Sequence, residues 1–232
     1  MKARECLIVN LKKIEYEKAW HLQKRIFQAK WGKKLDRDVL LLLEHPHTIT
    51  VGKKGEKDEI LVNSEKLKKR GISIFYIGRG GRVTYHGPGQ LVGYPILDLN
   101  FYLKDLHLYL RYLEEVLIRT LKEFGIEAER INGLTGVWVD RKKIASIGIK
   151  VRRWITLHGF ALNVNTELSY FNLIQPCGME AQIMTSMKRI LSRNIKVEEV
   201  AEKLVPKFSD IFRVRMREIS LSDLQGRLYQ DE

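Results

Sequence analysis

The sequence predicts a mixed α/β domain, in which helices flank a β-sheet. Short runs of β-branched, aromatic and leucine residues alternate with longer segments of helical periodicity. The runs between residues 137 and 163 follow one another closely enough to form hairpins, and no linker rich in Gly, Pro or Ser divides the 232 residues. We therefore expect one domain over residues 1–232, with a small C-terminal subdomain from about residue 194 as the one division left open.

The composition is that of a globular protein with an excess of positive charge. Lys and Arg number 41 against 28 Asp and Glu, a net charge of +13, and 44% of the residues are hydrophobic. No apolar run approaches the roughly 18 residues of a membrane span, and the N-terminus lacks the core and cleavage site of a signal peptide. Two cysteines make no disulfide scaffold, so the sequence predicts a cytoplasmic protein without a membrane partner.

The first elements are a strand, a helix and a buried strand. The apolar run Cys6–Leu11 predicts the first strand. Apolar residues at helical spacing predict a helix over Ile14–Trp31, which Gly32 ends. The run Val39–Leu43 predicts a buried strand that ends before Pro46, since proline lacks the donor for a ladder hydrogen bond.

A short basic helix and two further strands follow. Ser64 is the expected N-cap of a helix that ends at Gly71. The β-branched and aromatic stretch Ile72–Ile77 predicts a strand, and Leu91–Leu97 predicts another.

Leucines at steps of three and four residues then predict the clearest amphipathic helix, ended by Gly125. They are Leu103, Leu106, Leu110, Leu113, Leu117 and Leu121. Because sustained heptads are missing, this stripe indicates core packing and not a coiled coil.

The last third of the chain combines hairpin strands with helices. Strands are predicted over Val137–Val139, Lys143–Ile149 and Ile155–Asn163, and Asp140-Arg141 turns the first into the second. Helices are expected over Ala181–Ser192 and Val197–Ile211, the second disturbed by Pro206.

The segment from Arg79 to Gln90 is the most informative for function. Gly80-Gly81 would let backbone N–H groups approach a ligand, and Thr84 and His86 would share one face of an extended segment. The alternative is a glycine turn that leads into a strand. The segment matches neither a P-loop nor a Rossmann fingerprint.

Cys177 and Lys143 are the candidate reactive groups. Cys177 lies between Pro176 and Gly178, before the expected helix, where a helix N-terminus would favour the thiolate. A buried structural thiol is the alternative, and it describes Cys6 better. Strand alternation would put Lys143 on the more apolar face with Ala145, where burial would favour the neutral amine; a solvated basic corner is the alternative.

The histidines add polar rings but no metal site. His158 lies beside Gly159, and His45 and His47 flank Pro46. Their spacing, with Cys177, lacks the paired pattern of a zinc site, so no metal is expected.

Five segments, in order, resemble the lipoyl(octanoyl) transferase family, whose members move an octanoyl group from acyl carrier protein to a lysine of a lipoyl domain. They are Leu43-Glu44-His45-Pro46 with Gly52, the Arg79–Gln90 segment, Lys143 to Gly148, Leu157 to Asn163, and Pro176-Cys177-Gly178 with Thr185-Ser186. Residues 1–42 and the tail after Ser192 carry none of these motifs.

The resemblance implies a biotin/lipoate protein ligase-like catalytic domain with a mixed β-sheet flanked by helices. It implies Cys177 as the acyl-thioester nucleophile, Lys143 as its acid/base partner and His158 in a supporting role. Implied substrate-binding residues are Arg79, Gly80, Gly81, Arg82, Val83, Thr84, Tyr85, His86, Ser146, Ile147, Gly148, Gly159, Phe160 and Ala161.

The resemblance also implies the partners. These are octanoyl-acyl carrier protein, the lipoyl domains of 2-oxoacid dehydrogenase complexes and the glycine cleavage H protein, served by a monomer in the cytoplasm. A thioester donor is already activated, so neither ATP nor a metal is implied. Backbone N–H groups near Cys177 and in Gly80-Gly81 are candidate donors to the oxyanion.

Three alternatives remain open on the sequence. One is an ATP-dependent lipoate or biotin protein ligase of the same fold. Another is a basic nucleic-acid-binding module, although no motif for nucleic acid is present and we expect no such partner. The third keeps the thiol but pairs Cys177 with His86 or His158.

Overall fold

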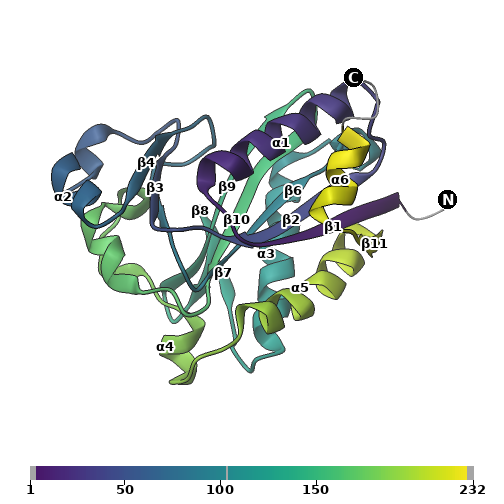
Figure 1. The fold of residues 1–232 in the computed structure, drawn as a ribbon. Coiled ribbons are helices and arrows are strands. Elements are labelled where there is room, and N and C mark those ends of the chain that lie inside the picture. The colour runs from purple at the N-terminus through teal and green to yellow at the C-terminus, as the bar shows by residue number, and fades with distance from the viewer. Residues whose placement is uncertain (1–3, 103, 229–232) are drawn as a thin grey trace.

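The computed structural model describes residues 4–102 and 104–228, and at Cys177 it describes the backbone without the side chain. An eight-stranded mixed sheet has the order β11-β1-β2-β6-β10-β9-β8-β7, and a three-stranded sheet has the order β4-β3-β5. Helices cover both faces of the large sheet, and the small sheet lies to one side (Figure 1). This mixed sheet flanked by helices confirms the predicted fold class.

The strands of the large sheet are β1 (Arg4–Lys13), β2 (Asp38–Glu44), β6 (Gln90–Ile96), β7 (Glu129–Ile131), β8 (Leu134–Val139), β9 (Lys142–Arg152), β10 (Ile155–Asn163) and β11 (Val214–Glu218). Those of the small sheet are β3 (Thr48–Val51), β4 (Ser73–Tyr76) and β5 (Val83–His86). The helices are α1 (Tyr16–Trp31), α2 (Ser64–Lys69), α3 (Leu106–Lys122), α4 (Met187–Leu191), α5 (Val197–Phe212) and α6 (Leu221–Leu228). Short 3₁₀ turns are η1 (Lys57–Glu59), η2 (Leu99–Phe101), η3 (Leu168–Leu173), η4 (Pro176–Gly178) and η5 (Ala181–Ile183).

The large sheet is apolar on both faces because it is covered on both faces. Along β2, Leu40 and Leu42 pack into the core under α3 and α5, whereas Leu41 and Leu43 pack into the core under α1 and α6. This explains why the sequence of β2 is a continuous apolar run without alternation.

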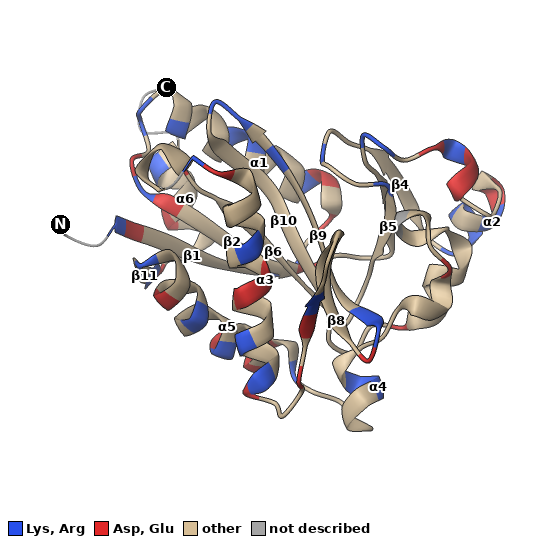
Figure 2. Ribbon diagram, turned by 180° about the vertical axis from the view of Figure 1, so that it is seen from behind, with Lys and Arg blue, Asp and Glu red and all other residues tan. Residues whose placement is uncertain are grey.

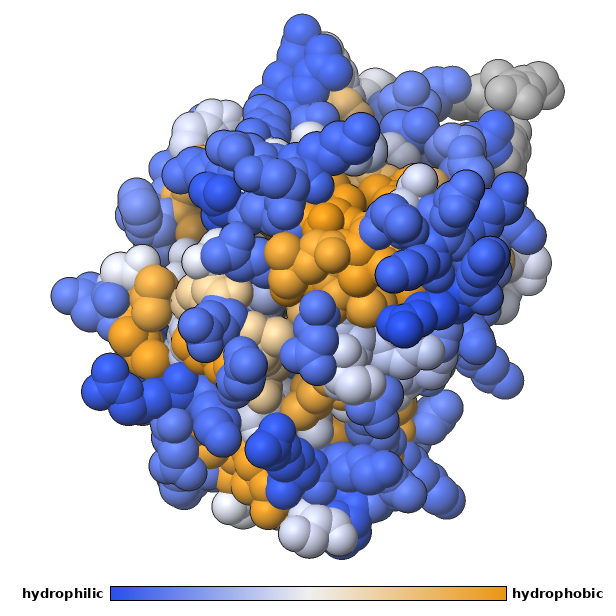
Figure 3. All heavy atoms as spheres, turned by 90° about the vertical axis from the view of Figure 1, so that its left-hand side faces the viewer, coloured by the Kyte–Doolittle hydropathy of each residue, from blue (hydrophilic) through white to orange (hydrophobic). Residues whose placement is uncertain are grey.

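The small sheet has a core of its own. Ile49, Val83 and Tyr85 pack there against Leu67 of α2 and Phe171 of η3. On the face of the molecule shown in Figure 3, apolar side chains emerge among mostly hydrophilic ones. The small sheet, with α2 and η3 packed against it, forms a small lobe. In this lobe, Leu61 and Tyr76 are 61% and 63% exposed.

Several expected elements differ in extent or in cap. The N-cap of α2 is Asn63, whose side chain accepts a hydrogen bond from the backbone N–H of Lys66, so the expectation of Ser64 was wrong by one residue. The predicted helix over Ala181–Ser192 is broken into η5 and the short α4, which Ser186 caps. Cys177 therefore does not directly precede an α-helix. Leu103, at the start of the leucine stripe, lies outside the described residues.

Helix α5 runs unbroken through Pro206. The ring of Pro206 is exposed, so the carbonyl that loses its partner faces water, while Val200, Leu204 and Phe208 are fully buried on the opposite side. Burial of that face stabilises the helix on both sides of the proline. The tail after it adds β11 in parallel to β1, and α6 packs on the opposite face of the sheet, so residues from 194 onward join the main sheet and cores.

Charge is spread over several elements. In the view of Figure 2, Lys and Arg alternate with Asp and Glu along α3 and α5. Glu115 pairs with Arg119 within α3, and Glu123 pairs with Lys207 between the two helices. Much of this surface charge is thus neutralised locally. None of the described helices is long and apolar enough to cross a membrane.

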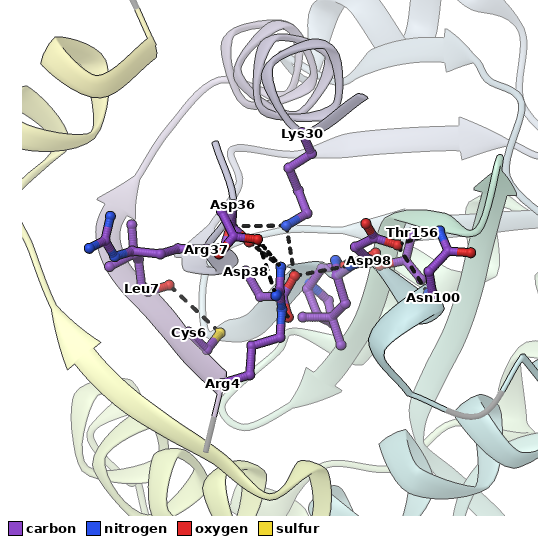
Figure 4. Close-up of polar contacts among 12 residues, drawn as sticks. Arg4, Cys6, Leu7, Lys30, Asp36, Arg37, Asp38, Asp98, Asn100 and Thr156 are labelled. Atoms are coloured by element: carbon purple, nitrogen blue, oxygen red, sulfur yellow. Dashed lines mark hydrogen bonds and ion pairs between the residues drawn. The ribbon is translucent and has the colours of Figure 1, made fainter. Parts of the chain in front are cut away.

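A buried carboxylate ties together the end of the sheet remote from the small lobe. Asp38, at the start of β2, is fully buried. Its two oxygens accept hydrogen bonds from Lys30 Nζ (2.7 Å), Arg4 Nε (2.8 Å), the Tyr102 hydroxyl (2.7 Å) and the backbone N–H of Asp98 (3.0 Å). Figure 4 shows Arg4, Lys30 and Asp98 converging on Asp38 from β1, α1 and the segment after β6.

Asp38→Asn is expected to lower the free energy of unfolding by about 3 kcal/mol, because it leaves the buried Lys30 without its counter-charge and removes the buried partner of Arg4. Asp36→Asn is the matched control, since the Asp36 side chain is 81% exposed beside the same Arg4. The control should change stability by less than about 0.5 kcal/mol. Urea denaturation of the full chain measures both, and equal losses would contradict this account of Asp38.

Candidate active site

A cavity that opens to solvent lies between the large sheet, the small sheet and the N-terminal end of α1. Its walls bring together residues that are far apart in the sequence. They are Tyr16, Arg79, Gly81, Thr84, His86, Tyr94, Ser146, Ile147, Gly148, His158, Gly159, Phe160 and Ala161. Ten of the fourteen residues expected to bind substrate line it, and so does His158.

Strand alternation in β5 explains which of the expected residues reach the cavity. Thr84 and His86 face it, as the sequence predicts, whereas Val83 and Tyr85 point into the core of the small lobe. Arg82 turns instead to Glu59, with Nε 2.6 Å from the carboxylate. Arg82, Val83 and Tyr85 lie outside the cavity wall, and their assignment as substrate-binding residues stays a prediction.

The fourth residue outside the wall is Gly80. Its N–H donates to the carbonyl oxygen of Ile149 in β9, at 2.8 Å. That N–H is therefore not available as an oxyanion donor, contrary to the expectation. The bond instead closes the loop before β5 onto the large sheet.

Arg79 is nearly buried at the centre of the cavity wall. Its Nη2 donates to both the carbonyl and the hydroxyl oxygen of Thr50 in β3, at 2.8 and 2.9 Å. Its stem lies against Gly148, where an added Cβ would stand 3.1 Å from Arg79 Cδ. Glycine at 148 thus gives the arginine room to reach across from the small sheet to the large one.

His158 lines the cavity from within β10, where its backbone conformation is irregular. Its φ of 59° is left-handed, which is costly for a histidine in the middle of a strand. Gln23 of α1 accepts a hydrogen bond from the His158 N–H (2.8 Å), and Trp20 stacks on the ring with centroids 4.6 Å apart. Helix α1 therefore holds both the backbone and the ring of His158 in place.

Two buried polar atoms on the cavity wall have no hydrogen-bond partner within the described part of the chain: the Tyr16 hydroxyl and Nε2 of His158. Such atoms cost free energy unless a ligand or water satisfies them. They indicate that the cavity is built to receive polar as well as apolar atoms.

Tyr16 and Tyr94 line the cavity but carried no signal in the sequence. Tyr16 is the first residue of α1, and Tyr94 lies inside an apolar strand. The Tyr94 hydroxyl donates to Nε2 of His45 (2.8 Å), whose Nδ1 donates to the carbonyl of Ile14. Only the tertiary fold brings these side chains together.

Burial keeps the histidines around the cavity neutral. It lowers the pKa of His45 to about 4. It also lowers the pKa of His86 to about 3, assisted by the neighbouring His45, and that of His158 to about 3, assisted by Arg79. These rings are therefore hydrogen-bonding groups at neutral pH and not cations.

Lys143 is 4% exposed, but it lies on the face opposite to the predicted one. The register of β8 and β9 shifts, so that Trp138 pairs with Lys143 while Val137 pairs with Ala145, and the bulged Ile144 packs into the same core as Ala145. Lys143 consequently shares a face with Trp138, whose ring centroid is 5.3 Å from Nζ. Ser146 and Gly148, on the cavity wall, lie on that same face.

Cys177 lies in η4, and its side chain lies outside the described residues. The backbone of η4 packs against β5, and a Cβ added at Gly178 would stand 3.2 Å from Cδ of Arg82. The backbone N–H of Gln175 donates to the carbonyl of Glu59 (2.8 Å). The loop of Cys177 is thus anchored beside the strand that supplies Thr84 and His86 to the cavity.

The chain after this loop returns to Lys143. The backbone N–H of Thr185 donates to the carbonyl of Lys143 at 3.0 Å, and Met184 bridges to Lys143 in parallel. Within the described part of the chain, no group of three or more His, Cys, Asp or Glu is placed to hold a metal ion.

The mixed sheet flanked by helices carries a largely apolar cavity beside the cysteine loop and a buried lysine, as expected of an acyl-handling enzyme. Residues 15–209 match the model of the lipoyl protein ligase A/B catalytic domain. A curated octanoyltransferase of Caldicellulosiruptor saccharolyticus is 46% identical over 217 residues, covering 93% of this chain and 92% of that protein. Another, of Caldicellulosiruptor bescii, is 49% identical over 204 residues, with 87% and 89% covered.

The chain therefore belongs to the lipoyl protein ligase A/B catalytic-domain family, and its activity is that of an octanoyltransferase. Solved structures agree on the fold. A bipartite lipoate protein ligase of Thermoplasma acidophilum, solved with its E2 lipoyl domain, superposes with a TM-score of 0.77 at 20% identity, covering 98% of this chain and 91% of that one. A biotin protein ligase of Aquifex aeolicus in complex with biotin and ATP gives 0.55 at 15% identity, with 92% and 71% covered.

The neutral histidines predict a loss of stability between pH 7 and pH 5. Their folded pKa values lie below the unfolded value of about 6.5, so the unfolded chain takes up protons first and the folded state loses stability as the pH falls. The loss should be on the order of 1–2 kcal/mol for each of His45, His86 and His158 at pH 5. The carboxylates whose pKa values are lowered by folding have ordinary pKa values of 4.5 or less. Their own effect on stability therefore falls mainly below pH 5.

Urea denaturation at pH 7 and pH 5 measures this effect. His158→Asn removes one titrating ring at a position whose left-handed backbone asparagine tolerates, so its stability should depend less on pH than that of the parent. A free energy of unfolding that stays constant from pH 7 to pH 5 would contradict the burial of neutral rings.

Proposed function

We propose that this octanoyltransferase works through a covalent intermediate on Cys177, with Lys143 as acid/base partner and the described cavity as the acyl site. The observation that carries the proposal is the convergence of three expected segments, around residues 79–86, 146–148 and 159–161, on one cavity. The proximity of the η4 loop to β5 and the burial of Lys143 on the cavity side of β9 support it.

In the first step, the Cys177 thiolate attacks the carbonyl carbon of the octanoyl thioester carried on phosphopantetheine. Lys143 takes the thiol proton beforehand and returns it to the phosphopantetheine sulfur as the old carbon–sulfur bond breaks. The products are an octanoyl thioester on Cys177 and a free carrier thiol. Because one thioester replaces another, neither ATP nor a metal ion is needed.

In the second step, the amine of a lipoyl-domain lysine attacks the thioester on Cys177. Lys143 accepts a proton from that amine and passes it to the Cys177 sulfur as the carbon–sulfur bond breaks, so that an amide and the free enzyme thiol result. Arg79 and the neutral histidines support this step, since a cationic wall with uncharged acceptors disfavours an incoming ammonium and favours the neutral amine.

Apolar and small residues accommodate the octanoyl chain. Ile147 and Phe160 offer apolar contacts, and Gly148 and Gly159 leave space beside them. The donor would be octanoyl-acyl carrier protein, and the acceptors lipoyl domains and the glycine cleavage H protein. Carriers of this kind are acidic, which suits the net charge of +13. Such substrates place the reaction in the cytoplasm, with the enzyme acting as a monomer.

Incubation with octanoyl carrier protein should add one octanoyl group to the enzyme, detected as an increase in intact mass and mapped to Cys177 by peptide analysis. Cys177→Ser should form no adduct and transfer no octanoyl group, because a serine hydroxyl is not ionised at neutral pH. Cys6→Ser is the control: Cys6 is fully buried, and burial raises the pKa of its thiol, so the adduct should persist. Octanoyl transfer by Cys177→Ser, or an octanoyl-adenylate formed from ATP and octanoate, would refute the proposal.

Lys143→Arg should lower the rate of transfer by about 10²–10⁴-fold, because a guanidinium does not release its proton at neutral pH. The adjacent Lys142 is exposed at the hairpin, so Lys142→Arg should retain the parental rate. Steady-state kinetics with octanoyl carrier and a lipoyl domain decide between them. A loss of rate in Lys142→Arg with the parental rate in Lys143→Arg would show that the acid/base role had been given to the wrong lysine.

A further inference from the structure

A row of buried hydrogen bonds connects the cavity to Lys143. Nδ1 of His86 donates to Oε1 of Gln90 at 2.8 Å, and Nε2 of Gln90 donates to Oδ1 of Asn163 at 2.9 Å. Nδ2 of Asn163 then donates to the carbonyl of Thr185 at 3.0 Å, and the backbone N–H of Thr185 donates to the carbonyl of Lys143 at 3.0 Å. The row crosses β5, β6, β10 and the segment before α4, and it ends on β9.

The direction of these bonds is determined by the side-chain chemistry. Nε2 of Gln90 also donates to the carbonyl of Tyr85 at 3.2 Å, so the amide oxygen must be the atom that faces His86. Because an amide oxygen can only accept, the neutral His86 carries its proton on Nδ1 and donates from there. Since the oxygen of Asn163 accepts from Gln90, its NH₂ group must face Thr185. Each amide has one orientation only.

None of the amides can exchange these partners for water. Gln90 is 2%, Asn163 1% and Thr185 2% exposed. Loss of one bond would leave a buried polar group unsatisfied, which is unfavourable. The row is therefore rigid, and each member restrains the next.

The segment that the row holds is the one that places Cys177 relative to Lys143. Thr185 ends the stretch that starts at η4, and its N–H bonds to Lys143 next to the bulge at Ile144. On the side of β10, the carbonyl of Thr185 is held by the side chain of Asn163. The backbone of Thr185 is thus fixed between strands β9 and β10, and the returning loop is fixed with it.

We infer that Gln90 and Asn163 are positioning residues of the transfer reaction: they orient the Thr185 segment, and through it the alignment of the Cys177 loop with Lys143. This inference rests on the proposed roles of Cys177 and Lys143. Neither amide is on the cavity wall, so neither is required to touch the acyl chain.

Asn163→Asp tests the inference with an isosteric change. The carboxylate still accepts from Gln90, but it cannot donate to Thr185 and instead opposes a second oxygen. Two quantities should fall by about 10²-fold: kcat for octanoyl transfer, and the rate at which iodoacetamide alkylates Cys177, mapped by peptide mass. KM for octanoyl carrier should stay unchanged, because the acyl cavity is intact.

Gln90→Glu is a second, milder variant, since it removes the donor to Asn163 and keeps the acceptor for His86. It should lower kcat and the alkylation rate about tenfold, as expected for the loss of about 1.4 kcal/mol of hydrogen bonding. Asp38→Asn is the matched control, because it is also a buried, isosteric and destabilising change but lies remote from the cavity. Rates are normalised to the folded fraction, measured by circular dichroism.

A loss of kcat in Asn163→Asp and Gln90→Glu no greater than in Asp38→Asn, or a rise of KM with kcat retained, would overturn the inference. Lys143→Arg separates this failure from failure of the proposed function. If Lys143→Arg lowers transfer and the two amide variants do not, the positioning role alone is wrong. If Lys143→Arg transfers normally, the acid/base role of Lys143 is wrong, and the inference falls with it.

Discussion

The architecture of the site depends on the close approach of a buried arginine to a β-sheet. Arg79 comes from the loop before β5, yet it lies over Gly148 of β9 and is anchored to Thr50 of β3. A Cβ at position 148 would stand 3.1 Å from both Arg79 Cδ and the carbonyl oxygen of Gly80, so a side chain there would crowd this approach. Burial keeps the surrounding rings neutral, and this cation adds to the effect at His86 and His158, since a charged imidazole beside it would be repelled.

Two irregularities in the central strands direct polar groups toward the same side. In β10, the left-handed residue His158 departs from regular strand geometry, and β6 places Pro95, which has no N–H, nearby. The hydroxyl of Thr156 compensates by donating to the carbonyl of Pro95 and accepting from the N–H of Leu97. In β9, the bulge at Ile144 turns Lys143 to the face of Ser146 and Gly148. Regular alternation would have pointed neither side chain to the cavity face in this way.

The sequence is informative where one local rule decides the structure. The apolar periodicity of α1, α3 and β2 follows from burial on one or both faces, and the turn Asp140-Arg141 follows from two adjacent left-handed residues. The residues of the candidate site could be anticipated from the family motifs, and the structure brings motif residues from three separate strands onto one cavity. Other features could not be predicted, because each depends on contacts between segments distant in the chain. They are the bulge at Ile144, the broken helix after residue 180 and the contributions of Tyr16 and Tyr94 to the cavity. Alternation alone therefore assigned Lys143 to the wrong face.

The same geometry explains how one fold can serve both ligation and transfer. The structures that superpose on this chain include lipoate and biotin protein ligases at 20% identity or less, so what they share with it is the fold. The chemistry then depends on the residues placed on that fold. The proposed nucleophile lies on a loop anchored to β5 by backbone contacts, and the proposed base lies at a bulge. Neither position is required for the sheet to form, so both can differ between enzymes of one fold. What such a loop needs is a fixed distance from the base, and buried amides that bridge β6, β10 and the returning chain supply that restraint without entering the cavity.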